Sequence, residues 1–467
     1  MKLSALFLLL ATAAFPQVKL PPYTRNVLPN GLVLDQLIKR DVPMISLRAI
    51  VRGGAEADPS GKSGLGAITA ELLRRGSTSP QQLARTAEQF SEQLDFIGAS
   101  LNSRVDEQSI LLNMEFMAKD SARALDLFAD ALLRPSFPES ELAKVLAQRK
   151  DSLRALKDNP GQANAAYFRS FFFPAGHPYR NSPTGEESSL SSITRQDLMD
   201  HHSRLFCGSN MILIAAGDAT DQFQTSLRKV LEMVPAGQAY SWVKTAPPLS
   251  YKSARLLLID KPDATQTYFL IAQPGIHRIH PDRVPLDIIN TLFGGRFTSM
   301  LNDELRVNTG LTYGASSRMQ QDRLPGSILI STYTKTDTTI QAIDLALTIL
   351  KRIREKGIDQ EQLDSAKAYL KGTFPPGNLE TADQLAATLG NIELHDLNRG
   401  EVDDLFSRID AVTLEKANAV ARQYLQESNL QFCLLGQASR IQDAVKKYAP
   451  AMRVVPITDP GFRAPDF

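Results

Sequence analysis

The feature that most constrains the fold is an internal duplication, because two successive stretches of the chain show the same order of strand-like and helix-like patterns. In the first stretch, apolar and polar residues alternate between Asn-Gly and Gly-Gly breakers, as in strands joined by turns. Helical spacing, a second strand pattern, further helical patterns and an apolar strand follow in that order. These patterns cover 30–58 (strands), 64–75 and about 80–97 (helices), 101–116 (strand), 121–135, 139–159 and 193–206 (helices), and 210–218 (strand).

The second stretch repeats this plan after a Pro- and Ser-containing segment, 236–250, that is typical of a linker. Each half is roughly 200 residues long, well above the 20–50 residues of a solenoid repeat, which indicates a duplicated domain. Strands joined by short turns and mixed with longer helices predict an α+β fold, with a mainly antiparallel sheet packed against helices in each half. We therefore predict two homologous domains, residues 18–235 and 251–467.

The first 17 residues predict a secretory signal peptide. Lys2 precedes an apolar run, and small residues suited to signal peptidase follow at 11–14. The apolar run is much shorter than the roughly 20 residues that span a bilayer, which argues against a retained anchor. No later segment is long and apolar enough to cross a membrane. We expect a secreted or periplasmic protein without a membrane span after the signal is removed.

Charge and cysteine content exclude several functions. Lys and Arg total 52 against 51 Asp and Glu, so the formal net charge of +1 gives no general attraction for nucleic acid. Cys207 and Cys433 are the only cysteines, and they lie in strand-like runs that correspond to each other in the two halves. A disulfide framework is therefore not expected, and two buried free thiols are the preferred interpretation.

Three segments carry a resemblance to a known family. Residues 63–78 (SGLGAITAELLRRGST) resemble the active-site helix of insulinase/pitrilysin-like metallopeptidases, also called inverzincins. Residues 183–218 resemble the end of the first domain of that family, and residues 293–317 (FGGRFTSMLNDELRVNTGLTYGASS) resemble a substrate-contacting segment of its second domain. Three such segments in the right order on a duplicated α+β plan make the resemblance specific.

The zinc motif of the family is degenerate in this chain. Active members carry His-x-x-Glu-His on the first helix, and a Glu on a later helix is the third zinc ligand. By this resemblance the first His falls on Ala67, the general-base Glu on Ala70, the second His on Glu71 and the later Glu on Ser152. Alanine can neither bind zinc nor accept a proton, so no cofactor is expected on this chain. Leu65, Ile68, Leu72 and Leu73 should instead face the core at helical spacing.

The remaining histidines offer no replacement site. His201 and His202 are adjacent on a predicted helix and point about 100 degrees apart, so they cannot readily share a metal. His277 and His280 lie in a predicted loop without a third ligand, and His177 and His395 are isolated. Nucleophile-elbow, phosphate-loop and catalytic-cysteine patterns are also missing from the chain.

An arginine and a tyrosine of the family remain. The resemblance implies that Arg306 and Tyr313 reach across to a zinc-bearing domain and hold the substrate backbone beside the scissile bond. A guanidinium and a phenol can both donate to a peptide carbonyl. Without that family context, Arg306 is equally well explained as a cation at a helix C-terminus, and Tyr313 as an ordinary strand aromatic. Gly310 suits the left-handed residue that would end the helix between them.

The resemblance implies a non-catalytic, substrate-positioning subunit of a heterodimeric zinc endopeptidase that acts on peptides or unfolded segments. Its partner would be a homologous subunit that carries the zinc. The alternative is a purely structural or assembly protein of the same family, with no role in hydrolysis. The retained Arg306 and Tyr313 favour the first function, whereas the lost zinc motif is expected under both.

Overall fold

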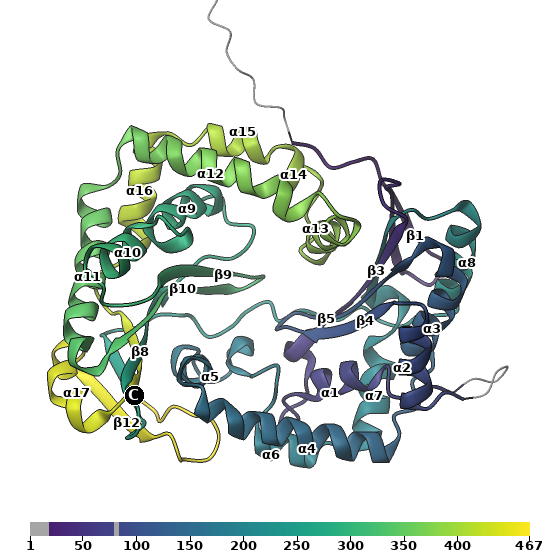
Figure 1. Cartoon of the computed structure of the whole chain (residues 1–467), viewed down its shortest axis with the longest axis horizontal. Helices are drawn as coiled ribbons and strands as arrows, with labels where there is room; N and C mark the ends of the chain where they lie inside the picture. Colours follow the sequence, from purple (N-terminus) through teal and green to yellow (C-terminus); the bar gives the residue numbers. More distant parts are fainter. Residues whose placement is uncertain (1–17, 79–83) are drawn as a thin grey trace, which may run out of the picture.

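A computed structural model describes residues 18–78 and 84–467 and contains two six-stranded sheets with helices on both faces (Figure 1). The first sheet has the strand order β1-β2-β6-β3-β5-β4, and the second has the order β12-β7-β11-β8-β10-β9. Five strands of each sheet correspond in chain order to five strands of the other. The predicted α+β duplication is therefore confirmed, although residues 1–17, including the predicted signal, lie outside the described part of the chain.

The first half provides the first sheet and most of the helices around it. In chain order its elements are β1 (Thr24–Val27), β2 (Val33–Ile38), β3 (Met44–Arg52), α1 (Leu65–Leu72), α2 (Ala87–Phe96), β4 (Ser100–Val105), β5 (Ser109–Met117), α3 (Ser121–Leu133), α4 (Glu139–Ala155), α5 (Pro160–Phe172), α6 (Glu187–Ser192), α7 (Arg195–Leu205), β6 (Met211–Gly217) and α8 (Asp221–Glu232).

The second half provides the second sheet, and two π-helical turns interrupt its helices at Thr291–Gly295 and Asp303–Asn308. In chain order its other elements are β7 (Arg255–Asp260), β8 (Gln266–Pro274), α9 (Arg283–Asn290), α10 (Met300–Asn302), β9 (Ala315–Gln321), β10 (Pro325–Lys335), α11 (Thr339–Lys356), α12 (Gln360–Asn378), α13 (Ala382–Leu394), α14 (Gly400–Asp403), α15 (Leu405–Asp410), α16 (Leu414–Tyr424), β11 (Gln431–Gly436), α17 (Ala438–Val445) and β12 (Ala451–Pro456).

Each sheet is mainly antiparallel and is buried on both faces. In the first sheet, β3 pairs antiparallel with both β5 and β6, and β2 runs parallel to β6. In the second sheet, β8 pairs antiparallel with β10 and β11, and β7 runs parallel to β11. All seven residues of β6 and all six of β11 are buried. Continuous apolar runs of this kind are expected when helices cover both faces of a sheet.

The two halves exchange one helix each. Helix α13 of the second half packs on β3 and β6 of the first sheet, and α5 of the first half packs on β8 and β11 of the second sheet. In Figure 1, α13 lies between the first sheet and the centre of the molecule. Because a helix of each half completes the core of the other half, the two sheets are held in one body by buried apolar surface.

Polar contacts fix both exchanged helices. Arg48 of β3 donates to Asp383 at the start of α13 (2.8 Å), and Arg25 of β1 pairs with Glu393 near its end (2.8 Å). Within α13, a Cβ on Gly390 would lie 2.5 Å from Ile50 Cδ1, so glycine allows a close approach to the sheet. Across the molecule, Asn164 of α5 donates to the carbonyl of Cys433 at 3.2 Å.

Several expectations can be compared with the fold. Leu65, Ile68, Leu72 and Leu73 are all buried, and Cys207 and Cys433 are buried free thiols, as predicted. Helix α1 ends at Leu72, earlier than the predicted position 75, and α2 begins at Ala87 with a capping box at Thr86. Part of the helix predicted from about residue 80 lies outside the described residues. The domain boundaries stay predictions.

Helices α5 and α8 were not predicted. Pro160, which directly follows the predicted helix 139–159, is the first residue of α5, where proline's missing N–H carries no cost. Asn159 caps this helix by accepting a hydrogen bond from the backbone N–H of Gln162 (3.2 Å). In the second half, α10 is a short helix that continues directly as the second π-helical turn.

Candidate functional site

The former metal positions on α1 carry no group that could bind zinc. Ala67 and Ala70 are buried, with 9% and 2% of their surface exposed. The Glu71 carboxylate is engaged, because Nε and Nη2 of Arg149 both donate to its Oε2 at 2.9 and 2.6 Å. Arg75 also lies 3.7 Å from the same carboxylate. A half-buried ion pair therefore occupies the position that the resemblance assigns to the second histidine.

Helix α4 brings Arg149 into contact with Glu71 of α1, whereas Ser152 of the same helix does not line the cavity beside α1. The Ser152 hydroxyl is exposed and donates to the carbonyl of Gln148, one turn back on the same helix, at 2.8 Å. The alignment of Ser152 with the third ligand of the family stays a prediction. Sequence reasoning missed Arg149, and the signal that could have found it was the unpaired carboxylate expected at Glu71.

The residues present do not fit a zinc ion. Two methyl groups and a carboxylate already paired with a guanidinium leave no imidazole, thiolate or free carboxylate where the family would bind the metal. Within residues 18–78 and 84–467, no three His, Cys, Asp or Glu side chains converge in a metal-binding arrangement. We therefore derive no catalytic step through a metal on this chain.

A small cavity of about 220 Å³ lies beside these positions. One wall is β4, which pairs only with β5 and is the edge strand of the first sheet. Among the described residues, the charged side chains in the lining are those of Arg104 and Arg149. The complete lining is Ala67, Ala70, Ser103, Arg104, Val105, Arg149, Pro183 and Thr184.

Arg306 and Tyr313 lie together in the second half and line one cavity of about 650 Å³. Arg306 belongs to the π-helical turn Asp303–Asn308, a rare geometry that is frequently found at functional sites. Gly310 then adopts φ +63°, the left-handed conformation predicted for it. Tyr313 stands two residues before β9 rather than on the strand.

The hydrogen-bonding groups of both side chains are free. The guanidinium of Arg306 stacks over the Phe297 ring at 4.7 Å, and its side chain makes no hydrogen bond or ion pair with any described residue. Tyr313 is 80% exposed, and its hydroxyl has no partner in the described chain. The side chains of Phe297 and Val307 beside them are also mostly exposed, at 67% and 65%.

The two candidate sites are separate. The cavity beside α1 and the cavity of Arg306 have no lining residue in common. In Figure 1, α1 lies in the first half, and α10 and β9, which flank Arg306 and Tyr313, lie in the second. The structure therefore brings Arg306 and Tyr313 together but does not join them to the degenerate motif within one cavity.

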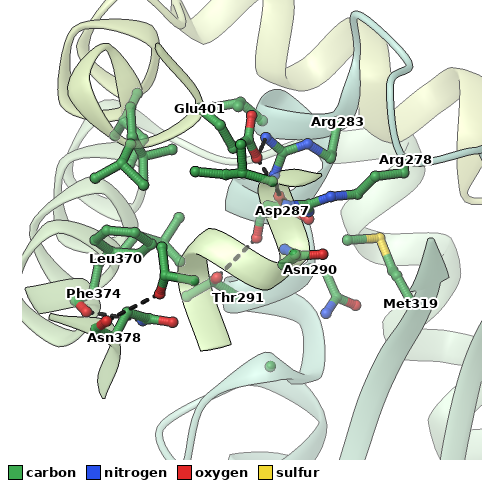
Figure 2. A pocket seen from close by; sticks show the side chains of 18 of the residues that line it. Arg278, Arg283, Asp287, Asn290, Thr291, Met319, Leu370, Phe374, Asn378 and Glu401 are labelled. Atoms are coloured by element: carbon green, nitrogen blue, oxygen red, sulfur yellow. Dashed lines mark hydrogen bonds and ion pairs between the residues drawn. The ribbon is translucent and has the colours of Figure 1, made fainter. Parts of the chain in front are cut away.

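A third pocket, of about 490 Å³, lies among α9, α12, α13 and α14 (Figure 2). Figure 2 shows Arg278 and Arg283 converging on Glu401, with Leu370 and Phe374 on the opposite wall. Arg278 Nη2 lies 2.9 Å from Glu401 Oε1, and Arg283 also pairs with Asp287 (3.3 Å). Because these arginines already have carboxylate partners, this pocket is neutralised from within and ties α9 to α14.

The histidines have structural roles. Burial lowers the pKa of His201 to about 3 and that of His202 to about 4, so both rings are neutral at pH 7. His201 Nε2 lies 3.7 Å from Asp58 Oδ1, and the Nε2 of His202 lies 3.0 Å from the carbonyl of Leu132. Burial also lowers the pKa of His177 and of His395 to about 4.

Comparison with known proteins places this fold in a family. The model of the insulinase family, peptidase family M16, matches residues 41–170, and that of the peptidase M16 inactive domain matches residues 192–370. A non-peptidase homolog, YmxG of Helicobacter pylori, is 24% identical over 85% of this chain and 90% of its own length. An uncharacterized zinc protease of Mycobacterium leprae is 23% identical over 86% of this chain and 89% of its own.

Solved structures show the same fold. A peptidase M16 inactive domain from Pseudomonas fluorescens superposes with a TM-score of 0.82 at 22% identity, covering 89% of this chain and 98% of that one. The first half of the periplasmic protease PqqL from Escherichia coli gives a TM-score of 0.72 at 15% identity, covering 92% and 97%. The chain belongs to the insulinase (M16) peptidase family and is a homologue of its inactive domain.

Proposed function

We propose that this chain is the non-catalytic, substrate-positioning subunit of a heterodimeric zinc endopeptidase that acts on peptides or unfolded segments. The observation that carries the proposal is that Arg306 and Tyr313 line one cavity with their hydrogen-bonding groups unengaged. A chain that only served as a scaffold would have no need to keep an unpaired guanidinium and a nearly fully exposed phenol together.

The chemistry assigned to this pair is recognition of a peptide carbonyl. The guanidinium presents a planar set of donors and the phenol a single hydroxyl, and both can stabilise negative charge that develops on a carbonyl oxygen. Water would be activated on a homologous partner that holds the zinc, because Ala67, Ala70 and the paired Glu71 supply neither ligand nor base. The exchanged helices keep both halves of this chain in one body. The space that encloses a substrate would therefore lie between this chain and its zinc-bearing partner.

The proposal includes export of this chain from the cytoplasm. The leader-like residues 1–17 support a secreted or periplasmic protein, and the Escherichia coli relative is described as periplasmic. Among the described residues, no helix combines the length and apolar character that a bilayer span requires.

The test is hydrolysis of an unstructured peptide by the chain reconstituted with its zinc-bearing homologue. Arg306→Ala and Tyr313→Phe should each lower kcat by about 10² to 10³, the usual cost of one preorganised donor to a developing oxyanion. Arg318→Ala and Tyr369→Phe are the matched controls. Both control residues lie in the second half outside the cavity of Arg306, and their variants should keep wild-type turnover.

Assembly must be measured alongside activity. Size-exclusion chromatography should show a normal heterodimer for all four variants, because surface substitutions usually change stability by less than about 0.5 kcal/mol. Wild-type turnover in both Arg306→Ala and Tyr313→Phe would contradict the proposal. It would leave the alternative, a structural or assembly protein of the family that takes no part in hydrolysis.

A further inference from the structure

The cavity beside α1 is lined by positive charge, whereas a site that coordinates a cation is lined by negative charge. Its charged lining residues are Arg104 and Arg149, and its polar lining residues are Ser103 and Thr184. No carboxylate of the described residues lines it. The nearest acid of α1, Glu71, holds Arg149 from outside the lining.

Arg149 is oriented in advance for binding. Its Nε and Nη2 are both held on one oxygen of Glu71, and its Nη1 makes no hydrogen bond with any described residue. The side chain is still 33% exposed. A guanidinium that is fixed through two of its nitrogens and open at the third loses little rotamer entropy when a further acceptor arrives.

Arg104 has no partner at all among the described side chains. It stands on the edge strand β4, and it also borders a second cavity that contains three acids, Asp106, Glu107 and Asp322. Those acids are already engaged: Glu107 pairs with Arg169 at 2.5 Å, Asp106 accepts from the backbone N–H of Ser109 at 2.7 Å, and Asp322 accepts from the side-chain amide of Gln320 at 2.9 Å. The charge of Arg104 is therefore available to the cavity beside α1.

The pocket of Figure 2 gives the contrast within the same molecule. There Arg278 and Arg283 face two carboxylates, because both pair with Glu401 and Arg283 also pairs with Asp287, so the protein itself neutralises the arginines. Beside α1, two arginines meet only one carboxylate, and one of the two is unpaired. An uncompensated pair of guanidinium groups in a concave site attracts an anion from outside.

We propose that the cavity beside α1 binds a carboxylate of a peptide, either an acidic side chain or a free C-terminus. The open Nη1 of Arg149 and the free guanidinium of Arg104 would donate to the carboxylate oxygens, and the hydroxyls of Ser103 and Thr184 would complete the site. A volume of about 220 Å³ suits one short acidic group rather than a large residue.

This inference rests on the proposed function only in taking a peptide as the ligand. It requires neither the partner subunit nor hydrolysis, so the isolated full chain is the right material. The probe is a short rhodamine-labelled peptide of Ala, Gly and Ser with a single central Glu and an amidated C-terminus. Two companions are the Gln analogue with an amidated C-terminus and the Gln analogue with a free C-terminal carboxylate.

Fluorescence polarisation should show the Glu peptide binding at least about tenfold more tightly than the amidated Gln analogue, since hydrogen bonds to charged groups are among the stronger ones. The Gln analogue with the free carboxylate shows which source is preferred: affinity near that of the Glu peptide supports a C-terminal carboxylate, and affinity near that of the amidated analogue supports an acidic side chain.

Arg104→Gln should abolish the preference for Glu over Gln, and folding should be kept because Arg104 is exposed and unpaired. Arg123→Gln makes the same charge change at an exposed arginine of α3 and should leave the preference intact. Equal affinity for the Glu and amidated Gln peptides overturns the proposal. So does a preference that survives Arg104→Gln, or one that Arg123→Gln reduces equally. Stronger displacement by inorganic phosphate than by acetate would reassign the cavity to phosphate.

Discussion

Asp35 provides the sharpest quantitative prediction, because it is a buried acid without a partner. It lies on β2 with none of its surface exposed, and neither carboxylate oxygen has a hydrogen-bond partner in the described chain. Burial, assisted by the nearby charge of Glu393, raises the pKa of Asp35 from 3.8 to about 7, and Arg25 opposes this shift. The folded protein therefore keeps Asp35 protonated over a range in which the unfolded chain has released the proton.

The sign and the size follow from linkage. A folded-state pKa above the unfolded value means that stability falls as pH rises from about 4 to about 7 and then levels off. A difference of about three pKa units corresponds to about 4 kcal/mol of unfolding free energy. Asp35→Asn removes this titration. The variant should therefore gain about 4 kcal/mol relative to wild type when the measurement moves from about pH 4 to about pH 8.

Urea unfolding, followed by the fluorescence of the single tryptophan Trp242, measures this difference at each pH. Asp130→Asn is the control, because Asp130 is equally buried but accepts from Ser77 and pairs with Arg134. Its loss should destabilise the protein by roughly 3–5 kcal/mol at about pH 8, since breaking a buried ion pair leaves an uncompensated charge. If the stability of Asp35→Asn relative to wild type does not change with pH, the assignment of a raised pKa to this carboxyl is refuted.

Three further outcomes are expected. The purified chain should hold no stoichiometric zinc after dialysis, and elemental analysis showing about one zinc per wild-type chain would contradict this. The double variant Ala67→His with Glu71→His should not gain hydrolytic activity, because Ala70 supplies no base. Leu389→Ala in α13 should lower the free energy of unfolding by about 2–5 kcal/mol and speed amide hydrogen exchange in β6 of the other half. Leu350→Ala in α11 is the control and should leave the β6 amides protected. Unchanged amide exchange in β6 of Leu389→Ala would refute the role of α13 in the core of the first half. N-terminal sequencing of native protein should find a first residue between about 14 and 18, and an intact Met1 would contradict export.

The sequence determined the α+β class, the duplication and the degenerate motif because each depends on local pattern. Strand alternation and helical spacing are properties of neighbouring residues, so the strands and most long helices could be located. The absence of zinc ligands at Ala67 and Ala70 is a matter of side-chain chemistry, which sequence alone reveals. Gly310 was predicted as a left-handed residue for the same reason, and its φ of +63° agrees.

Tertiary structure decided which half completes which core and which charges meet. Nothing in the spacing of α5 or α13 indicates that each packs on the sheet of the other half, because both surfaces are apolar in the same way. The pairing of Arg149 with Glu71 joins residues 78 positions apart. Arg104 is left unpaired because Arg169 engages Glu107 and backbone N–H groups engage Asp106. Hydrophobic burial is non-directional and ion pairing depends on distance in space, so both are settled only when the whole chain has folded.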